Sequence, residues 1–386
     1  YSLAVGIGEF GDAQIVADTP ENLSTTAVKF ADINGSGTTD IIWVDVTGAP
    51  EDSWRYLELF PDGRGGLLRQ IDNGLGKVVR ITYEPAALSA ARAREAGEPW
   101  ASRMNVAMPV VQSIEIDSSL DDPRMVTRYE YRDGTWDPRE RTFAGFAAGI
   151  QTEVGDENTP TLLTENTFDP GLSHRAMRGL ILTSEQRDVH GHVFRITTNG
   201  YTTSSLDRAL DGRAVQYAYK SSEQVEHVEG PDPSAARTVL TEWERDELGN
   251  VVREARWGEV VGPDRLAGND ESITVRTFAN DEAEWVLGRV ATERVEDGEG
   301  NRVAEKRRYY DGAAFEGLPL GEVTRGDLRR VESWIECDRF VDEKRHDHDE
   351  HGNVVVSLDA RGGRGEYDWD PESFSFVGAE RRFPEA

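Results

Sequence analysis

Alternation of apolar and polar residues is the dominant pattern along this chain. It is clearest in KVVRITYE (77–84), VVQSIEID (110–117) and MVTRYEYR (125–132). Successive side chains of a strand point to opposite faces, so a period of two predicts half-buried β-strands. The apolar run FAGFAAGI (143–150) predicts a buried strand. The 38 glycines are spread between such runs, as turns between many short strands require. The pattern therefore predicts a mainly β, antiparallel fold.

One segment departs from this pattern. EPAALSAARAREAGEP (84–99) is rich in alanine, with Pro85 near its start and Gly97 near its end. Proline suits the first turn of a helix and glycine suits its termination. We therefore expect residues 85–97 to form the main helix, a short insertion between strands.

A repeated motif marks the second half. RDVHGHVFRI (187–196), RDELGNVVRE (245–254), EDGEGNRVAE (296–305) and HDEHGNVVVS (348–357) share the form D-x-x-G-[NH] followed by a strand. An aspartate can accept hydrogen bonds from turn amides, and glycine tolerates the positive φ that follows. The motif predicts hairpin tips at Gly191, Gly249, Gly300 and Gly352, in a repetitive sheet whose strands pair with their neighbours.

The segment FADINGSGTTDIIWVD (30–45) places oxygen-bearing residues at every second position. Its candidate ligands are Asp32, Asn34, Ser36, Thr38 through its carbonyl, and Asp40. Such a loop suits Ca²⁺, which takes six to eight oxygens. It has only two carboxylates and no glutamate at position 12, so it is not an EF-hand. The alternative interpretation is a polar turn without metal. Calcium is the one candidate cofactor.

Other chemistry is weakly indicated. HDHDEHGN (346–353) has a spacing that could seat a transition metal, but it coincides with the fourth predicted turn. Carboxylates such as Asp121 with Asp122 and Glu223 with Glu226 could form an acid and base pair, although 72 acidic residues produce such neighbours by chance. A lone Cys337 predicts no disulfide framework. No nucleophile elbow, phosphate loop or zinc-protease motif occurs. We therefore expect no catalytic residues and no enzyme.

Charge and hydropathy exclude two classes of partner. There are 43 Lys and Arg against 72 Asp and Glu, a formal charge of −29. Nucleic-acid binding needs a basic surface, so no nucleic acid is expected. No apolar run approaches the roughly 20 residues of a membrane span. The chain starts at Tyr1 in a strand-like segment without a signal-peptide pattern, so we expect a piece of a longer polypeptide.

Several segments resemble one family. VGIGEFGDA (5–13) with the oxygen-rich loop resembles an FG-GAP or VCBS propeller repeat. IDNGLGKVVRITYEPA (71–86), the segment 96–119 and YEYRDGTWDPRERTFAGFA (129–147) resemble the middle region of the B component of insecticidal Tc toxin complexes, also called SpvB-type proteins. RRYYDG (307–312) and DEHGNVVVSLDARGGRGEYDWD (349–370) are similar to its later part, which leads into Rhs/YD repeats.

The resemblance implies an architecture and partners. Residues 1–60 would end an FG-GAP/VCBS-like β-propeller, 61–236 would be the N-terminal part of the middle region, and 237–386 its C-terminal part with YD-like hairpins. The last two would form the wall of a hollow Rhs/YD-type β-shell that encloses a toxic C-terminal effector. The implied partners are the C component with its Rhs core and, through the propeller, the pore-forming A component. The implied location is extracellular, after secretion.

Two other functions stay open on the sequence. The chain could be a surface adhesin that joins FG-GAP and YD modules and binds glycans or proteins, as in teneurin-like proteins. A glycoside-active enzyme on a β-scaffold is the other alternative, and no motif supports it.

Overall fold

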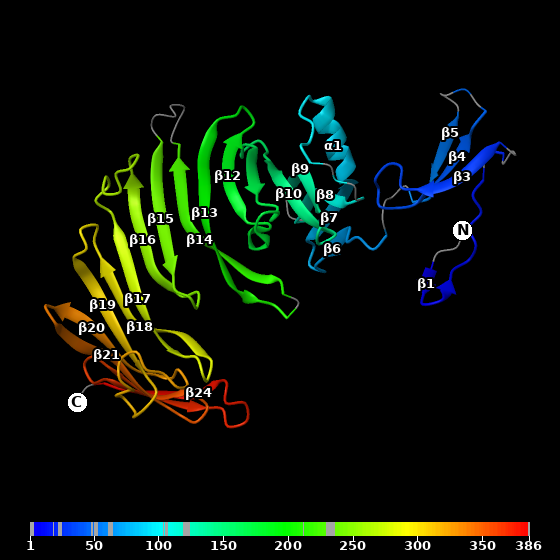
Figure 1. Cartoon of the computed structure of the whole chain (residues 1–386). Helices are drawn as coiled ribbons and strands as arrows, with labels where there is room; N and C mark the ends of the chain where they lie inside the picture. Colours follow the sequence, from blue (N-terminus) through cyan, green and yellow to red (C-terminus); the bar gives the residue numbers. More distant parts are fainter. Residues whose placement is uncertain are drawn as a thin grey trace. The chain divides into compact units, whose positions relative to one another are not determined.

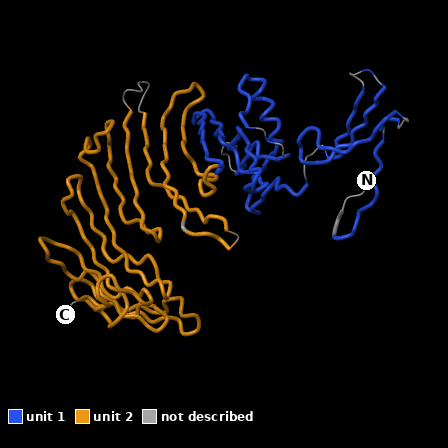
Figure 2. The backbone as a smooth tube through the Cα atoms, in the orientation of Figure 1, with its two compact units in different colours: residues 1–172 blue, residues 173–386 orange. Residues whose placement is uncertain are grey.

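The computed structural model describes residues 4–17, 19–21, 25–47, 49, 53–60, 65–102, 104, 107–118, 124–210, 212–228 and 236–384. The chain divides into two compact units, Tyr1–Leu172 and Ser173–Ala386 (Figure 2). The boundaries expected after residues 60 and 236 stay a prediction, and residues 61–64 and 229–235 beside them lie outside the described residues.

The first unit contains three antiparallel sheets. Strands β1 and β2 form a pair, β3–β4–β5 form a second sheet, and β6–β7–β8–β9–β10–β11 form the largest. The elements are β1 (Ala4–Gly6), β2 (Glu9–Phe10), β3 (Thr26–Ala31), β4 (Asp40–Asp45), β5 (Trp54–Glu58), β6 (Gln70–Asp72), β7 (Val78–Pro85), α1 (Ala86–Glu95), β8 (Pro109–Asp117), β9 (Met125–Asp137), β10 (Thr142–Val154) and β11 (Leu162–Phe168).

The second unit is one sheet in which each strand from β12 to β24 pairs antiparallel with the next (Figure 1). A 3₁₀ turn, η1 (Arg175–Met177), precedes it. The strands are β12 (Ile181–Asp188), β13 (Val193–Arg208), β14 (Ala214–His227), β15 (Arg237–Arg245), β16 (Val251–Val260), β17 (Ser272–Asp281), β18 (Val286–Glu296), β19 (Arg302–Tyr310), β20 (Leu328–Glu336), β21 (Arg339–His348), β22 (Val354–Asp359), β23 (Arg364–Trp369) and β24 (Val377–Phe383). The predicted mainly β, antiparallel fold is confirmed.

The predicted helix is also confirmed, because α1 is the α-helix of the described residues. Pro85 is its N-cap, with φ of −65°, and the helix ends just before Gly97, whose φ is +82°. Glu84, at the end of β7, is 6% exposed and accepts hydrogen bonds from Ser89 and from both terminal nitrogens of Arg92. This contact joins the helix to the strand that precedes it.

The hairpin tips occur where the repeated motif places them. Gly191, Gly249, Gly300 and Gly352 have φ between 85° and 86°. At the second tip, the Asp246 Oδ1 accepts the amides of Leu248 and Asn250 at 3.0 and 2.8 Å, and the Asn250 side chain donates to Oδ2. The strand register shifts beside the turn, at Glu244/Arg245. A turn closed by a left-handed glycine and a bulge matches the twist of the flanking strands.

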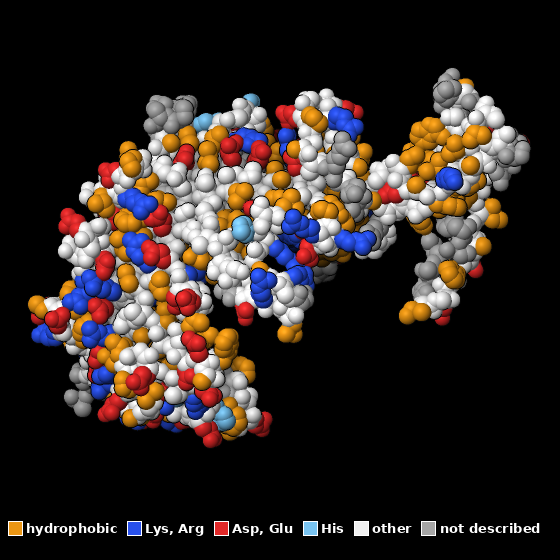
Figure 3. All heavy atoms as spheres, viewed as in Figure 1, with side chains coloured by type: hydrophobic (Ala, Val, Ile, Leu, Met, Phe, Trp, Pro, Cys, Tyr) orange, Lys and Arg blue, Asp and Glu red, His pale blue; other side chains and the backbone are white. Residues whose placement is uncertain are grey.

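The sheet of the second unit has ion-paired side chains on both faces. Its buried hydrophobic cluster is small and consists of Ala279, Ala291, Tyr310 and Val323. A ladder of ion pairs crosses β16 to β19. Arg276 pairs with Glu254 at 3.4 Å and with Glu293 at 3.0 Å, and Glu293 also pairs with Arg308 at 3.3 Å. Figure 3 shows acidic and basic side chains interspersed over this unit. Each such pair contributes little alone, but cross-strand pairs favour one register.

The prediction of a buried strand at 143–150 is wrong in part: the segment lies in β10 of the first unit, and within it Ala144 alone is buried.

The three-stranded sheet β3–β4–β5 has large apolar side chains on both faces, and one basic residue on each, Lys29 and Arg55. Val28 opposes Trp43 on one face, and Ile42 opposes Tyr56 on the other. Phe30, Trp54 and Tyr56 are 68%, 50% and 48% exposed, and hydrophobic side chains gather over these strands in Figure 3. A sheet with one solvent-exposed face alternates apolar and polar residues along each strand. Apolar residues on both faces are typical of a sheet that is covered on both sides.

Candidate functional site

The oxygen-rich loop connects β3 to β4 in the first unit. All five predicted ligand residues lie in it or, for Asp40, at the first position of β4. Gly35 and Gly37 have φ of +75° and +82°, which allows the chain to curl back on itself. The loop thus gathers the predicted residues locally, although no described group of three or more His, Cys, Asp and Glu side chains could hold a metal ion.

The loop oxygens already accept hydrogen bonds from the loop itself. The two Asp32 oxygens accept the amides of Ser36 (2.9 Å) and Gly37 (2.8 Å). Asn34 Oδ1 also accepts the Ser36 amide, while its Nδ2 donates to Glu58 on β5. Each of these oxygens keeps a second lone pair. The geometry is that of an Asx-type turn that still has acceptor capacity.

Asp40 is the one ligand candidate with an unsatisfied atom. Its side chain is fully buried, and Oδ2 accepts the Ile33 amide at 3.0 Å. Its Oδ1 is buried without a hydrogen-bond partner. A buried carboxylate oxygen without a partner is costly, and a cation would satisfy it.

The loop lies against helix α1. A Cβ on Gly35 would come within 2.9 Å of the Ala87 Cβ, so the contact requires glycine. Beside this contact is a cavity of about 1020 Å³, lined by loop residues, by the alanine face of α1 and by Trp100. The buried indole N–H of Trp100 has no hydrogen-bond partner.

The histidine-rich segment does not gather into a metal site among the described residues. His346 and His348 lie on β21 with ring centroids 6.2 Å apart, and His351 stacks on Phe374 at 4.1 Å instead. Burial lowers the pKa of both His346 and His348. Cationic neighbours add to the effect, and at His348 three nearby aspartates oppose it.

The carboxylate pairs considered from the sequence are engaged in other ways or not described. Glu223 pairs with Lys220 at 2.7 Å, and Glu226 accepts a hydrogen bond from Gln224. Asp121 and Asp122 lie outside the described residues.

Sequence reasoning missed Asp311, which follows β19 in the RRYYDG segment. It is 5% exposed, has φ of +53°, and accepts the backbone amides of Thr324, Arg325, Gly326 and Asp327 at 2.7–3.1 Å. Burial alone would raise its pKa, but the four amide donors outweigh burial and lower the pKa to about 2. Its partners lie 13 to 16 residues downstream, so the only local signal was an Asp-Gly pair after a strand. The carboxylate anchors the long β19–β20 connection.

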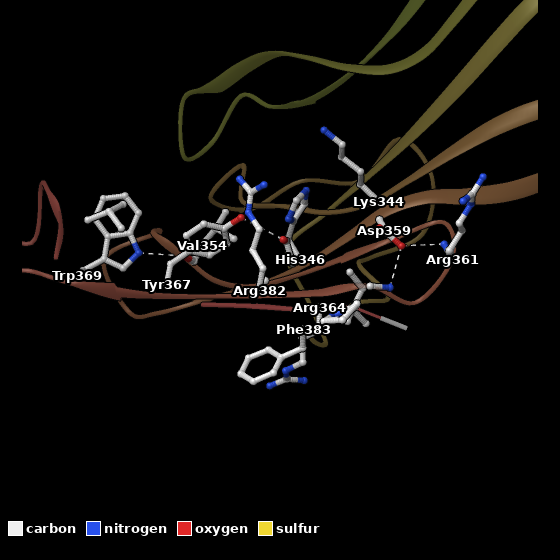
Figure 4. Close-up of a pocket in the computed structure, with 16 residues that line it drawn as sticks. Lys344, His346, Val354, Asp359, Arg361, Arg364, Tyr367, Trp369, Arg382 and Phe383 are labelled. Atoms are coloured by element: carbon white, nitrogen blue, oxygen red, sulfur yellow. Dashed lines mark hydrogen bonds between the residues drawn. The ribbon is translucent and has the colours of Figure 1, made fainter. Parts of the chain in front are cut away.

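A groove of about 950 Å³ lies on the last four strands of the second unit (Figure 4). Sequence reasoning missed it because its residues come from four strands between 344 and 384. It contains Lys344 and His346 on β21, Tyr367 and Trp369 on β23, and Arg382 on β24. Cationic and aromatic side chains therefore share one concave surface.

A family model resembles the first part of this chain. Residues 4–175 match the model of the insecticide toxin TcdB middle/N-terminal region. No curated protein matches the chain in sequence. Within the described residues, no helix is both long and apolar enough to cross a membrane.

Solved structures share the fold. A TcdB2–TccC3–Cdc42 structure matches 97% of this chain with a TM-score of 0.78 at 14% identity. A TcdB2–TccC3 structure matches 96% with a TM-score of 0.77 at 15% identity. A Photorhabdus luminescens Tc holotoxin pore matches 97% with a TM-score of 0.76 at 14% identity. This chain spans 24–25% of the length of those chains. Residues 4–175 are thus similar to the TcdB middle/N-terminal region, and nearly the whole chain has the fold of the TcdB2 structures.

Proposed function

We propose that this chain is a structural, non-enzymatic part of the wall of a hollow β-shell in a secreted Tc-type B component. The shell would enclose a toxic C-terminal effector together with the C component. The observation that carries this proposal is the second unit: a sheet of consecutive antiparallel strands, with ion-paired side chains on both faces, in a chain with the fold of TcdB2. The TcdB2 structures contain TccC3, which supports the choice of partner.

The chemistry of the sheet suits a wall. Hydrogen bonds between consecutive strands satisfy the backbone, and ion pairs such as Arg276 with Glu293 satisfy the side chains. An apolar inner face would bind an unfolded polypeptide tightly, because exposed apolar segments bury against apolar surface. A polar face would let the effector lie next to the wall and still leave.

Two of the buried carboxylates, Glu84 and Asp311, support a non-enzymatic role. Glu84 is neutralised by Arg92, and Asp311 is held by four amides. Each has a structural partner for every carboxylate oxygen, which leaves neither oxygen open for proton transfer with a substrate.

The first 60 residues would end a β-propeller that contacts the pore-forming A component. The three-stranded sheet β3–β4–β5, with large apolar side chains on both faces, supports a blade packed between neighbours. The holotoxin pore among the similar structures supports an A component as partner.

The loop from 32 to 40 would bind Ca²⁺ weakly and stabilise the connection between β3 and β4. Asp32, Asn34, Ser36, the Thr38 carbonyl and Asp40 would be the ligands, with Asp40 Oδ1 as the open acceptor. Two carboxylates suit a Kd of about 10⁻⁴ to 10⁻³ M. Calorimetry should show Ca²⁺ heats for the wild type and for Asp12→Ala, on an exposed carboxylate outside the loop, but not for Asp40→Ala. Identical heats for Asp40→Ala and wild type would leave the loop a simple turn.

The shell itself is tested with the full-length protein and its effector. Limited proteolysis should spare the effector inside the intact protein and digest it when it is expressed alone. Asp311→Asn, which weakens the wall, should reduce this protection, whereas Asp338→Asn at a fully exposed site should not. Equal digestion of the enclosed and the free effector would refute encapsulation and favour the adhesin.

A further inference from the structure

The groove on β21–β24 has one face of the sheet as its floor. Lys344 pairs with Asp359 in register, His346 with Ser357, Ser357 with Gly365, and Gly365 with Arg382, so these residues share that face. A Cβ on Gly365 would lie 3.0 Å from both the Ser357 Oγ and the Tyr367 hydroxyl. Arg364 and Phe383 oppose each other in register and point to the other side of the strands (Figure 4).

The groove is cationic in a strongly acidic chain. Lys344, Arg361 and Arg382 line it on this face, against the single carboxylate of Asp359. Arg382 pairs with Glu380 at 2.7 Å, but Lys344 and Arg361 make no ion pair with any described residue. Asp359 Oδ1 accepts the amides of Arg361 and Gly363, both at 2.8 Å, so this carboxylate is engaged in the hairpin turn.

The two ends of the groove differ in chemistry. Figure 4 shows Trp369 and Tyr367 at one end, Lys344 and Arg361 at the other, and His346 with Arg382 between them. The Trp369 indole donates to the Val354 carbonyl at 2.9 Å, which fixes the ring. The His346 Nδ1 is buried without a hydrogen-bond partner.

We propose that this groove binds an extended acidic peptide segment. Its carboxylates would pair with Lys344 and Arg361, and an apolar side chain a few residues away would pack on Trp369 and Tyr367. A small anion would use the basic end alone, whereas an extended peptide occupies both ends. The cations outnumber the one carboxylate of the groove, and this charge supports the acidic character of the ligand. The binding would be salt-sensitive, because the cations are exposed. This inference is independent of the shell.

The test uses fluorescence anisotropy of the full chain with a labelled peptide of four glutamates followed by two leucines. Replacing the glutamates by glutamines should weaken binding at least tenfold, and replacing the leucines by serines at least threefold. Lys344→Glu with Arg361→Glu should also weaken binding at least tenfold. The matched control, Lys29→Glu with Lys77→Glu, makes the same charge change on exposed lysines of the first unit and should leave binding unchanged.

Three results would overturn the proposal. The first is equal binding of the glutamate and glutamine peptides to the wild type, which needs no variant to fold. The second is an equal loss in both double variants, which would indicate overall charge and not this groove. The third is full competition by inorganic phosphate together with equal binding of the leucine and serine peptides, which would reduce the groove to a small-anion site.

Discussion

Replacing Asp311 by asparagine removes the charge that anchors the β19–β20 connection and turns an amide group toward backbone N–H donors. The ordinary pKa of the carboxyl is 3.8, and the folded-state pKa is about 2. By linkage, this difference corresponds to roughly 2.5 kcal/mol of stability at neutral pH, at 1.36 kcal/mol per pKa unit. The side chain is 5% exposed, so solvent screens little of it. We expect Asp311→Asn to lower the free energy of unfolding by about that amount or more, since N–H donors lose their acceptor.

The pH dependence has a defined sign. The folded pKa is depressed, so the contribution is complete above about pH 4 and disappears as the pH falls toward about 2. Urea denaturation of wild type and Asp311→Asn should therefore give a gap of about 2.5 kcal/mol at pH 7 that narrows between pH 4 and pH 2. Asp338→Asn, at a fully exposed hairpin tip, is the matched control and should change stability by less than about 0.5 kcal/mol. A gap below about 0.5 kcal/mol at pH 7, or one that stays constant down to pH 2.5, would refute the reasoning.

Three further predictions concern local structure. Gly249→Val should lower the free energy of unfolding by at least about 1 kcal/mol, because the backbone φ at this position is +85°. Thermal unfolding measures this change, and an unchanged Tm would contradict the prediction. Cys337→Gly should raise the free energy of unfolding by about 0.5–1 kcal/mol, because Cys337 has φ of +48° at the β20–β21 tip and glycine adopts this conformation without strain. A lower urea midpoint for the variant would contradict this. Glu84→Gln should lower the free energy of unfolding by about 2–3 kcal/mol and speed amide hydrogen exchange in α1, because Arg92 loses its charged partner. Unchanged exchange in α1 would show that the Glu84–Arg92 contact does not hold the helix.

The hairpin tips could be predicted because their determinants are local. Asp246, Gly249 and Asn250 make the turn with one another, and the same holds at the other three tips. A fifth tip of the same geometry, at Asp359 and Gly362, was missed because glycine replaces the Asn or His of the motif. Helix α1 was also predictable, since an alanine run between proline and glycine needs no tertiary information.

The ladder, the Asp311 anchor and the groove could not be predicted. They depend on which residues lie opposite one another, and alternation does not determine strand register. Glu254, Arg276 and Glu293 are neighbours only because β16, β17 and β18 pair as they do. The oxygen-rich loop shows the opposite case: its five residues are brought together by local sequence, but only the fold buries Asp40.

The neighbour-only pairing of β12 to β24 has a consequence for synthesis. In a sheet whose strand order follows the chain, each new strand finds its partner in the hairpin made just before it. Loop closure is then short at every step, and folding can proceed as the polypeptide leaves the ribosome. Such a sheet can also lengthen by adding hairpins without repacking an interior, so its size can change by whole hairpins during evolution.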